Sequence, residues 1–163
     1  MKILFISTGG TIDKDYARKA KTYNFEISEP AVKRVLEIVN PNFDYEIKSI
    51  LKKDSLDITD EDRQMIFNEV KKAKEDKIII THGTDTIINT AEKFNNIKDK
   101  TIVLVGSGIP EKFAQSDAQF NIGFAVGVLS ILSNGVYIAM SGRIYKWDEV
   151  RKEQNNGQFV EKL

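Results

Sequence analysis

The chain has 163 residues, with 24 Lys or Arg and 24 Asp or Glu, so its formal net charge is zero. The chain therefore lacks the excess of basic residues that draws a domain to nucleic acid or to an anionic membrane surface. The sequence contains no cysteine, which excludes disulfides, thiol catalysis and cysteine-based metal sites. A chain of this length can bury a core without cross-links, and we expect residues 1–163 to form a single domain.

The N-terminus opens with a short apolar run, Ile3–Ile6. This run is too short for the core of a signal peptide and far too short to span a membrane. We therefore expect a soluble, cytoplasmic protein with no membrane partner.

Similar apolar runs recur along the chain, and they are typical of strands buried on both faces of a parallel sheet. Five such runs predict five strands, at Lys2–Ser7, Tyr45–Leu51, Lys77–Thr81, Thr101–Val105 and Val136–Met140.

Helix-like stretches lie between the predicted strands. One begins at Pro30, one follows Thr59, one follows Thr86 and runs to about Phe94, and one spans roughly 116–132. The second is the clearest, because Thr59 precedes Asp-Glu-Asp, which indicates a helix cap with an acidic first turn. The alternation predicts a three-layer, doubly wound α/β domain with a mostly parallel, flavodoxin-like or Rossmann-like sheet of five or more strands. The predicted strand order is 2-1-3-4-5.

Two segments have no strong pattern. Residues 13–29 form a long loop with a weak strand signal at Tyr23–Ile27, and we expect this loop to act as a mobile lid. From Arg143 onward the chain is polar and irregular, and no sixth strand is obvious there. The fourth helix carries three large apolar residues at helical spacing that we expect in the core: Phe120, Phe124 and Val128.

The turns that follow three of the predicted strands contain the residues most suited to chemistry. In a sheet of this order, ligands bind at the carboxyl ends of strands one and three, where the strand order reverses. Strand one runs into 7–12 (Ser-Thr-Gly-Gly-Thr-Ile), strand three into 81–86 (Thr-His-Gly-Thr-Asp-Thr) and strand two into 53–57 (Lys-Asp-Ser-Leu-Asp). Each turn alone is explained as a tight turn or a helix N-cap. Together they place hydroxyls, a carboxylate and glycine-freed backbone N–H groups around one crevice.

Common motifs of other site types are absent from these turns. The glycines lack the G-x-G-x-x-G spacing of a dinucleotide site and the Gly-Lys-Ser/Thr ending of a Walker loop. Residues 105–108 (Val-Gly-Ser-Gly) lack the G-x-S-x-G spacing of a nucleophile elbow. His82 is the only histidine, so a multi-histidine metal site is excluded. We interpret it as a turn residue whose ring bonds nearby backbone.

The motifs Thr8–Ile12 and His82–Thr86, in this order, resemble the bacterial-type L-asparaginase family. That family usually has a second, smaller domain, which would begin where this chain stops, so the chain is similar to the short single-domain members. The resemblance extends along nearly the whole sequence, through Asp54–Thr59, Val105–Pro110, Ser116–Asn121 and Gly135–Lys152.

The resemblance implies a threonine nucleophile, Thr11, and a second catalytic group made of Thr84, Asp85 and Lys152. Arg151 is adjacent to the lysine, so an offset of one position stays open. A threonine hydroxyl needs a group that accepts its proton. The resemblance also implies a lid tyrosine for this purpose, and the alternative is a neutral lysine acting through Thr84.

Tyr16 is the predicted lid tyrosine, and Tyr23 is its rival. The resemblance further implies that Ser55 and Asp85 hold the α-carboxylate and the α-ammonium of the substrate. It implies that the backbone carbonyl of Ser107 orients the substrate's side-chain amide.

These assignments imply hydrolysis of L-asparagine to L-aspartate and ammonia without a metal, nucleotide or organic cofactor. Backbone N–H groups at Gly10–Thr11 and Gly83–Thr84 are expected to bind the oxyanion of the tetrahedral intermediate. A homodimer or larger homo-oligomer is expected. Glutamine and D-asparagine stay open as further substrates. Two other functions stay open as alternatives: a non-catalytic amino-acid-binding module, and a flavodoxin-like or receiver-like domain.

Overall fold

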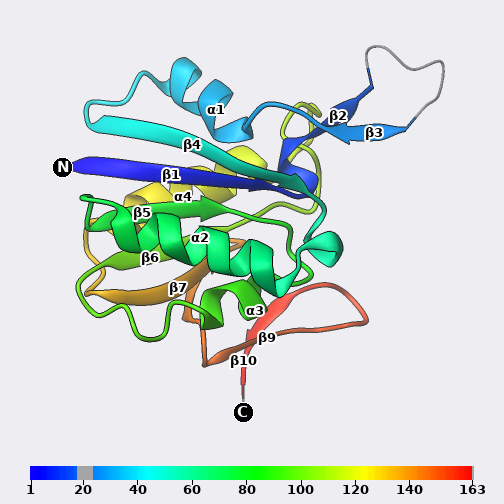
Figure 1. The fold of residues 1–163 in the computed structure, drawn as a ribbon. Coiled ribbons are helices and arrows are strands. Elements are labelled where there is room, and N and C mark those ends of the chain that lie inside the picture. The colour runs from blue at the N-terminus through cyan, green and yellow to red at the C-terminus, as the bar shows by residue number, and fades with distance from the viewer. Residues whose placement is uncertain (18–23, 163) are drawn as a thin grey trace.

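The computed structural model describes residues 1–17 and 24–162 (Figure 1). Two short 3-10 helices occupy Thr11–Asp13 and Ser55–Asp57. The remaining elements, in chain order, are β1 (Lys2–Gly9), β2 (Lys14–Tyr16), β3 (Phe25–Ile27), α1 (Ala31–Val39), β4 (Asp44–Lys53), α2 (Asp60–Lys72), β5 (Lys77–Thr81), α3 (Ile87–Glu92), β6 (Thr101–Val105), α4 (Ala118–Leu129), β7 (Gly135–Met140), β8 (Arg143–Lys146), β9 (Val150–Lys152) and β10 (Phe159–Glu161).

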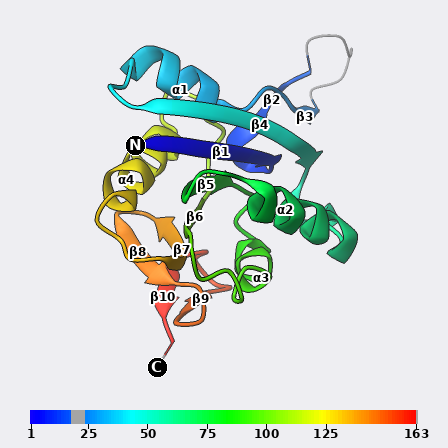
Figure 2. The ribbon, with the colours of Figure 1, turned by 60° about the vertical axis from the view of Figure 1, so that its left-hand side comes forward.

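The central sheet has six strands in the order β4-β1-β5-β6-β7-β8. The first five are parallel to their neighbours, and β8 runs antiparallel to β7. Helices α1 and α4 cover one face, and α2 and α3 cover the other (Figures 1 and 2). The predicted three-layer α/β fold and the strand order 2-1-3-4-5 are therefore confirmed.

Each central strand supplies both cores, because successive side chains point to opposite faces of the sheet. In β1, Ile3 and Phe5 pack with α1 and α4, whereas Leu4 and Ile6 pack with α2 and α3. All four side chains are fully buried. This two-sided burial explains why the strands read as continuous apolar runs rather than as alternating patterns.

Helix α2 begins where the cap pattern predicts. Thr59 Oγ1 accepts a 3.3 Å hydrogen bond from the backbone N–H of Asp62, and Asp62 Oδ2 accepts one of 2.9 Å from the backbone N–H of Thr59. This reciprocal capping box satisfies two N–H groups that the helix itself leaves unbonded. No helix in the described ranges is both long and apolar enough to cross a membrane.

Three sequence-based expectations about these segments are wrong or incomplete. The C-terminal region contains the edge strand β8, although no sixth strand was predicted. Its turn from β7 uses Ser141 and Gly142, both with positive φ. Only Tyr145 is buried in β8, so an edge strand of this kind lacks the apolar run of a central strand. The segment 13–29 is not a simple loop either, because β2 and β3 pair as an antiparallel hairpin.

The third concerns α4. Phe120 is 62% exposed, so its predicted place in the core is wrong, and Phe124 and Val128 are only partly buried. The buried residues of this helix instead lie on a neighbouring face: Ala118, Asn121, Ile122, Ala125 and Leu129.

Candidate active site

The turns that leave β1, β4 and β5 touch at the carboxyl edge of the sheet. A Cβ atom placed on Gly10 would lie 2.5 Å from the Cα atom of Gly83, and one placed on Gly83 would lie 2.7 Å from Ser55 Oγ. Gly10 also has a φ of 83°, a conformation that strains residues with a side chain. Glycine at both positions therefore lets the three turns meet, as the strand order predicts.

Thr11 and Thr84 follow the two touching glycines directly. Thr11 begins the 3-10 helix Thr11–Asp13 and is half-buried. Thr84 lies in the turn between β5 and α3. The two hydroxyl-bearing turns, far apart in sequence, are therefore neighbours at one edge of the sheet.

Lys152 joins this edge from the far end of the chain. Its Nζ donates hydrogen bonds to Thr84 Oγ1 at 2.9 Å and to Asp85 Oδ1 at 2.6 Å. The lysine lies on β9, where it pairs with Phe159 of β10, and the buried ring of Phe159 anchors this hairpin to the core. The structure thus brings together the threonine, the aspartate and the lysine of the predicted second catalytic group.

The neighbouring Arg151 takes no part in this cluster. Its guanidinium pairs with Glu153 at 3.2 Å. Successive residues of a strand point to opposite sides, so only one of the two cations can reach Thr84. Of the two adjacent cations, Lys152 is the one that contacts Thr84.

Ser55 contributes a buried hydroxyl beside the glycine contact. Among the described residues, Ser55 Oγ has no hydrogen-bond partner. The backbone carbonyl of Ser55 accepts a 2.7 Å hydrogen bond from Thr86 Oγ1, which ties this turn to the start of α3. Burying a hydroxyl without a partner costs stability, so the bonding capacity of Ser55 Oγ is left unsatisfied by the described residues.

The comparison with known proteins agrees with this geometry. Residues 2–158 match the family described as asparaginase, N-terminal. The chain belongs to this family. It is 30% identical over 165 residues to the glutaminase-asparaginase of Acinetobacter glutaminasificans, an alignment that covers 94% of this chain and 50% of that protein.

Two solved structures of the asparaginase family also resemble this chain. The L-asparaginase of Thermococcus kodakarensis superposes with a TM-score of 0.85 at 28% identity, covering 99% of this chain and 51% of that one. The probable cytoplasmic L-asparaginase of Campylobacter jejuni superposes with a TM-score of 0.77 at 25% identity, covering 93% and 48%. This asparaginase-family chain spans about half the length of these relatives.

The backbone donors at the glycine contact differ from the expectation in one position. The N–H of Gly10 donates to the Lys53 carbonyl at 2.9 Å, so its predicted use as an oxyanion donor is wrong. The N–H groups of Gly83 and Thr84 have no partner among the described residues. The N–H of Thr11 in the first turn likewise has no partner among the described residues, so both turns of this asparaginase-family chain keep unbonded donors.

His82 is a structural residue beneath the site. The ring is fully buried, with Nδ1 at 2.7 Å from the Gly83 carbonyl and Nε2 at 2.8 Å from Thr90 Oγ1. Burial lowers the pKa of His82 to about 4, so the ring is neutral at pH 7. A carbonyl only accepts, which assigns the proton to Nδ1. The interpretation of His82 as a turn residue that bonds backbone is confirmed.

The loop after β6 is fastened by two residues to which sequence reasoning gave no role. This loop carries Ser107, whose carbonyl is predicted to orient the substrate amide, and the residue is buried. The Asp117 carboxylate accepts a 3.0 Å hydrogen bond from the backbone N–H of Ile109, and Asn121 Nδ2 donates to the Gly106 carbonyl at 3.0 Å. Asparagine side chains inside a helix give little sequence signal of such a contact, because it depends on which loop the helix faces.

Tyr16 lies on the β2–β3 hairpin, and its side chain packs away from Thr11 and Thr84. It is 53% exposed, and its ring stacks on Phe25 and Phe113 with centroids 5.0 and 5.9 Å apart. Within residues 1–17 and 24–162, no hydrogen bond joins the Tyr16 hydroxyl to Thr11. The rival tyrosine, Tyr23, lies outside the described residues.

Asp13 is a buried carboxyl that sequence reasoning did not single out. It accepts hydrogen bonds of 2.7 Å from Ser7 Oγ and from the backbone N–H of Ala31. Burial raises the pKa of Asp13 to about 6, against the opposing effect of these two hydrogen bonds. Two charged groups also act on it: Arg34 of α1 lowers the pKa, and Glu111 of the loop after β6 raises the pKa.

The raised pKa of Asp13 predicts a pH-dependent stability. The folded chain binds this proton more tightly than the unfolded chain does. The protonated carboxyl therefore adds to the free energy of unfolding below about pH 4, and this added stability is lost as the pH rises through about 6. Asp13→Asn can still accept from Ala31 and donate to Ser7. Its stability relative to the wild type is expected to rise by about 2–3 kcal/mol between pH 4 and pH 7.

Urea unfolding at pH 4, 5, 6 and 7 measures this difference. The control is Asp99→Asn, because Asp99 is exposed and its substitution should shift stability little at any of these pH values. A constant difference between Asp13→Asn and the wild type would contradict titration of Asp13 in this range.

The glycine contact gives a second prediction. Gly10→Ala is expected to destabilise the fold by about 2–4 kcal/mol, because the new methyl group overlaps Gly83 and the φ is positive. Gly123→Ala is the matched control, since a Cβ there meets nothing within 4 Å and alanine favours a helix by about 0.5–1 kcal/mol. Thermal and urea unfolding of both variants test this, and equal stabilities would contradict the close approach.

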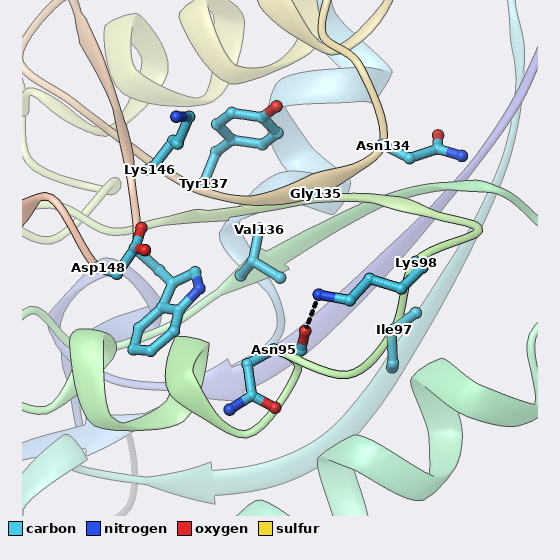
Figure 3. A pocket seen from close by; sticks show the side chains of 10 residues that line it. Asn95, Ile97, Lys98, Asn134, Gly135, Val136, Tyr137, Lys146 and Asp148 are labelled. Atoms are coloured by element: carbon cyan, nitrogen blue, oxygen red, sulfur yellow. Dashed lines mark hydrogen bonds between the residues drawn. The ribbon is translucent and has the colours of Figure 1, made fainter.

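A separate pocket of about 210 Å³ lies at the amino end of β7 and the carboxyl end of β8 (Figure 3). Asn95 and Trp147 line it, and Lys98 Nζ donates to the Asn95 carbonyl at 2.6 Å. None of the predicted site residues lines this pocket, so it is distinct from the threonine site.

Proposed function

We propose that this chain hydrolyses the side-chain amide of L-asparagine to give L-aspartate and ammonia. The observation that carries the proposal is the hydrogen bond from Lys152 to Thr84, formed where the Gly10–Gly83 contact brings Thr11 to the same edge. Family membership supports the reaction class. Because the chain spans about half the length of its relatives, their activity is proposed for it and not transferred.

Thr11 is the proposed nucleophile. Its Oγ attacks the amide carbon, the C–N bond then breaks, and ammonia leaves with the proton that Thr11 gives up. Water next attacks the acyl-threonine ester, the new C–O bond replaces the bond to Thr11 Oγ, and aspartate is released. The threonine hydroxyl is restored, so the cycle consumes only asparagine and water.

Proton transfer is proposed to run through Thr84 and Lys152, whose contact is already formed. A lysine accepts a proton only through the lone pair of its neutral form. Asp85 bonds the lysine nitrogen, so its proposed role is to orient the lysine. Tyr16 is the alternative proton relay, and it would have to leave its stack on Phe25 and Phe113.

The pocket groups suit a zwitterion. The proposed ligand of the substrate's α-carboxylate is the unpartnered hydroxyl of Ser55. Asp85 is half exposed, and only one of its oxygens is bonded to Lys152, which leaves the other for the α-ammonium. The free N–H groups of Gly83 and Thr84 are the proposed oxyanion donors, each typically worth about 2.7–4 kcal/mol in the transition state. The Ser107 carbonyl is proposed to orient the substrate amide, and no cofactor is required by this scheme.

Glutamine is the first alternative substrate, since one relative is named a glutaminase-asparaginase. A homo-oligomer is proposed as well. Phe120 and Ile109, both at the carboxyl edge, are 62% and 39% exposed, and a partner copy would cover them. A cytoplasmic location is proposed by likeness to the Campylobacter protein.

Ammonia release from purified protein tests the proposed function. We expect turnover of L-asparagine, a lower kcat/KM for L-glutamine and D-asparagine, and no change on adding EDTA. No ammonia from any of the three amides would contradict the proposal. If L-aspartate then raised the melting temperature, the chain would be a non-catalytic amino-acid-binding module instead.

A further inference from the structure

Three chain segments converge on the buried carboxyl of Asp13. The end of β1 donates to Oδ2 through Ser7 Oγ, and the start of α1 donates to Oδ1 through the backbone N–H of Ala31, both at 2.7 Å. The return of the β2–β3 hairpin donates through the backbone N–H of Ser28 to the Asp13 carbonyl at 2.8 Å. A single residue therefore joins the sheet, a helix and the hairpin base.

A fourth segment, the loop after β6, is fastened to the same point. The backbone N–H of Glu111 donates to the Ile12 carbonyl at 3.2 Å, and the Glu111 carboxylate accepts a 2.7 Å bond from Arg34 Nε. The side chain of Glu111 is almost fully buried. Further out, Lys112 of this loop forms an ion pair with Asp15 of the hairpin. The hairpin is thus held from both sides of Asp13.

Asp13 is adjacent in the chain to residues of the proposed site. Asp13 closes the 3-10 helix that Thr11 begins, and it directly precedes β2, which carries Tyr16. We propose that Asp13 is a positioning residue for the amide hydrolysis proposed above: its hydrogen bonds to Ser7 and Ala31 hold the Thr11 turn and the hairpin base in one arrangement.

Packing alone does not explain a carboxyl at this position. An apolar side chain of similar size would fill this buried site without the desolvation of a charge, whose cost is visible in the raised pKa of Asp13. What a carboxyl provides is two fixed acceptors for donors from different elements. Misplacement of a reacting group by about 1 Å costs about 10²-fold in rate, so such an anchor acts on kcat.

The first test compares Asp13→Ala with Asp13→Asn, which keeps the bond from Ala31 and reverses the bond with Ser7. Asp13→Ala is expected to lower kcat for L-asparagine about 10- to 100-fold, with KM changed less than about threefold. Asp13→Asn is expected to keep kcat within about threefold of the wild type. Asp99→Ala, at an exposed aspartate, is the control and should match the wild type. Ser7→Ala, which removes one of the two bonds, replaces Asp13→Ala if that variant fails to fold.

Two results would overturn the proposal. If Asp13→Ala loses only thermal stability and keeps kcat, the residue is structural. If Asp13→Asn falls as far as Asp13→Ala, the negative charge matters and positioning by hydrogen bonds does not.

Amide hydrogen exchange tests the anchor without relying on activity. Residues 11–17 and 24–31 are expected to exchange faster in Asp13→Ala than in Asp13→Asn, while β5 and β6 stay unchanged. Equal exchange in the two variants would overturn the anchor. If the wild type releases no ammonia but the exchange difference is present, the proposed function fails and the anchor stands.

Discussion

Replacing Thr11 with valine is expected to lower kcat for L-asparagine hydrolysis by about 10⁴-fold or more, because a nucleophile acts as part of a unit whose loss removes most of the catalysis. Valine has nearly the same shape, and Thr11 is half-buried next to Gly10. The far-UV circular dichroism should therefore match that of the wild type. Ammonia release at saturating substrate measures the effect.

The control for this substitution is Thr11→Ser, which keeps a hydroxyl at the same place. We expect it to retain a measurable part of the wild-type kcat, with the loss reflecting the freer serine rotamer. A slow substrate should also leave an acyl group on Thr11 of the wild type and none on the valine variant. Full activity of Thr11→Val would remove Thr11 as the nucleophile.

Lys152→Met is expected to lower kcat by about 10²–10⁴-fold, the usual contribution of a proton-transfer group. The methionine keeps most of the apolar stem but can donate to neither Thr84 nor Asp85, both of which bond the lysine in the wild type. KM should change less than kcat, because the lysine is not assigned a contact with the substrate charges. Steady-state kinetics at pH 7 and pH 9 measure both quantities.

The chain offers a matched control one residue away. Arg151→Met removes a cation from the same strand, but that cation pairs with Glu153 at the surface. Exposed ion pairs contribute little, so this variant should stay within about twofold of the wild type. Comparable losses in both variants would indicate a general charge effect and would exclude a specific role for Lys152.

A double-mutant cycle then tests whether the lysine acts through Thr84. If the two side chains form one unit, Thr84→Val and Lys152→Met together should cost little more than either alone. Additive losses would contradict a shared step.

Much of the fold follows from local pattern. The buried runs at Lys2–Ser7, Lys77–Thr81 and Thr101–Val105 can be recognised because a strand covered on both faces must be apolar throughout. The cap at Thr59 is equally local, since donor and acceptor are separated by three residues. The edge strand β8 cannot be recognised in this way, because only Tyr145 within it is buried and the strand has no apolar run.

Some features of the candidate site can also be predicted from the sequence, and others depend on the tertiary structure. Thr11 and Thr84 are set in turns whose glycines are visible in the sequence, and strand order alone predicts that those turns meet. The choice of Lys152 over Arg151 depends on which face of β9 points to the site. The loss of Gly10 as a donor depends on a carbonyl from β4, a strand distant in the sequence.

The sequence by itself thus determined the α/β class, the strand order, the family and the two threonine turns, because each is encoded in short stretches of neighbouring residues. Only the tertiary structure decided which cation reaches Thr84, which backbone N–H groups are free, and that Asp13 joins three segments. Those outcomes depend on distances between segments far apart in the chain, and such distances are set by packing and not by local composition.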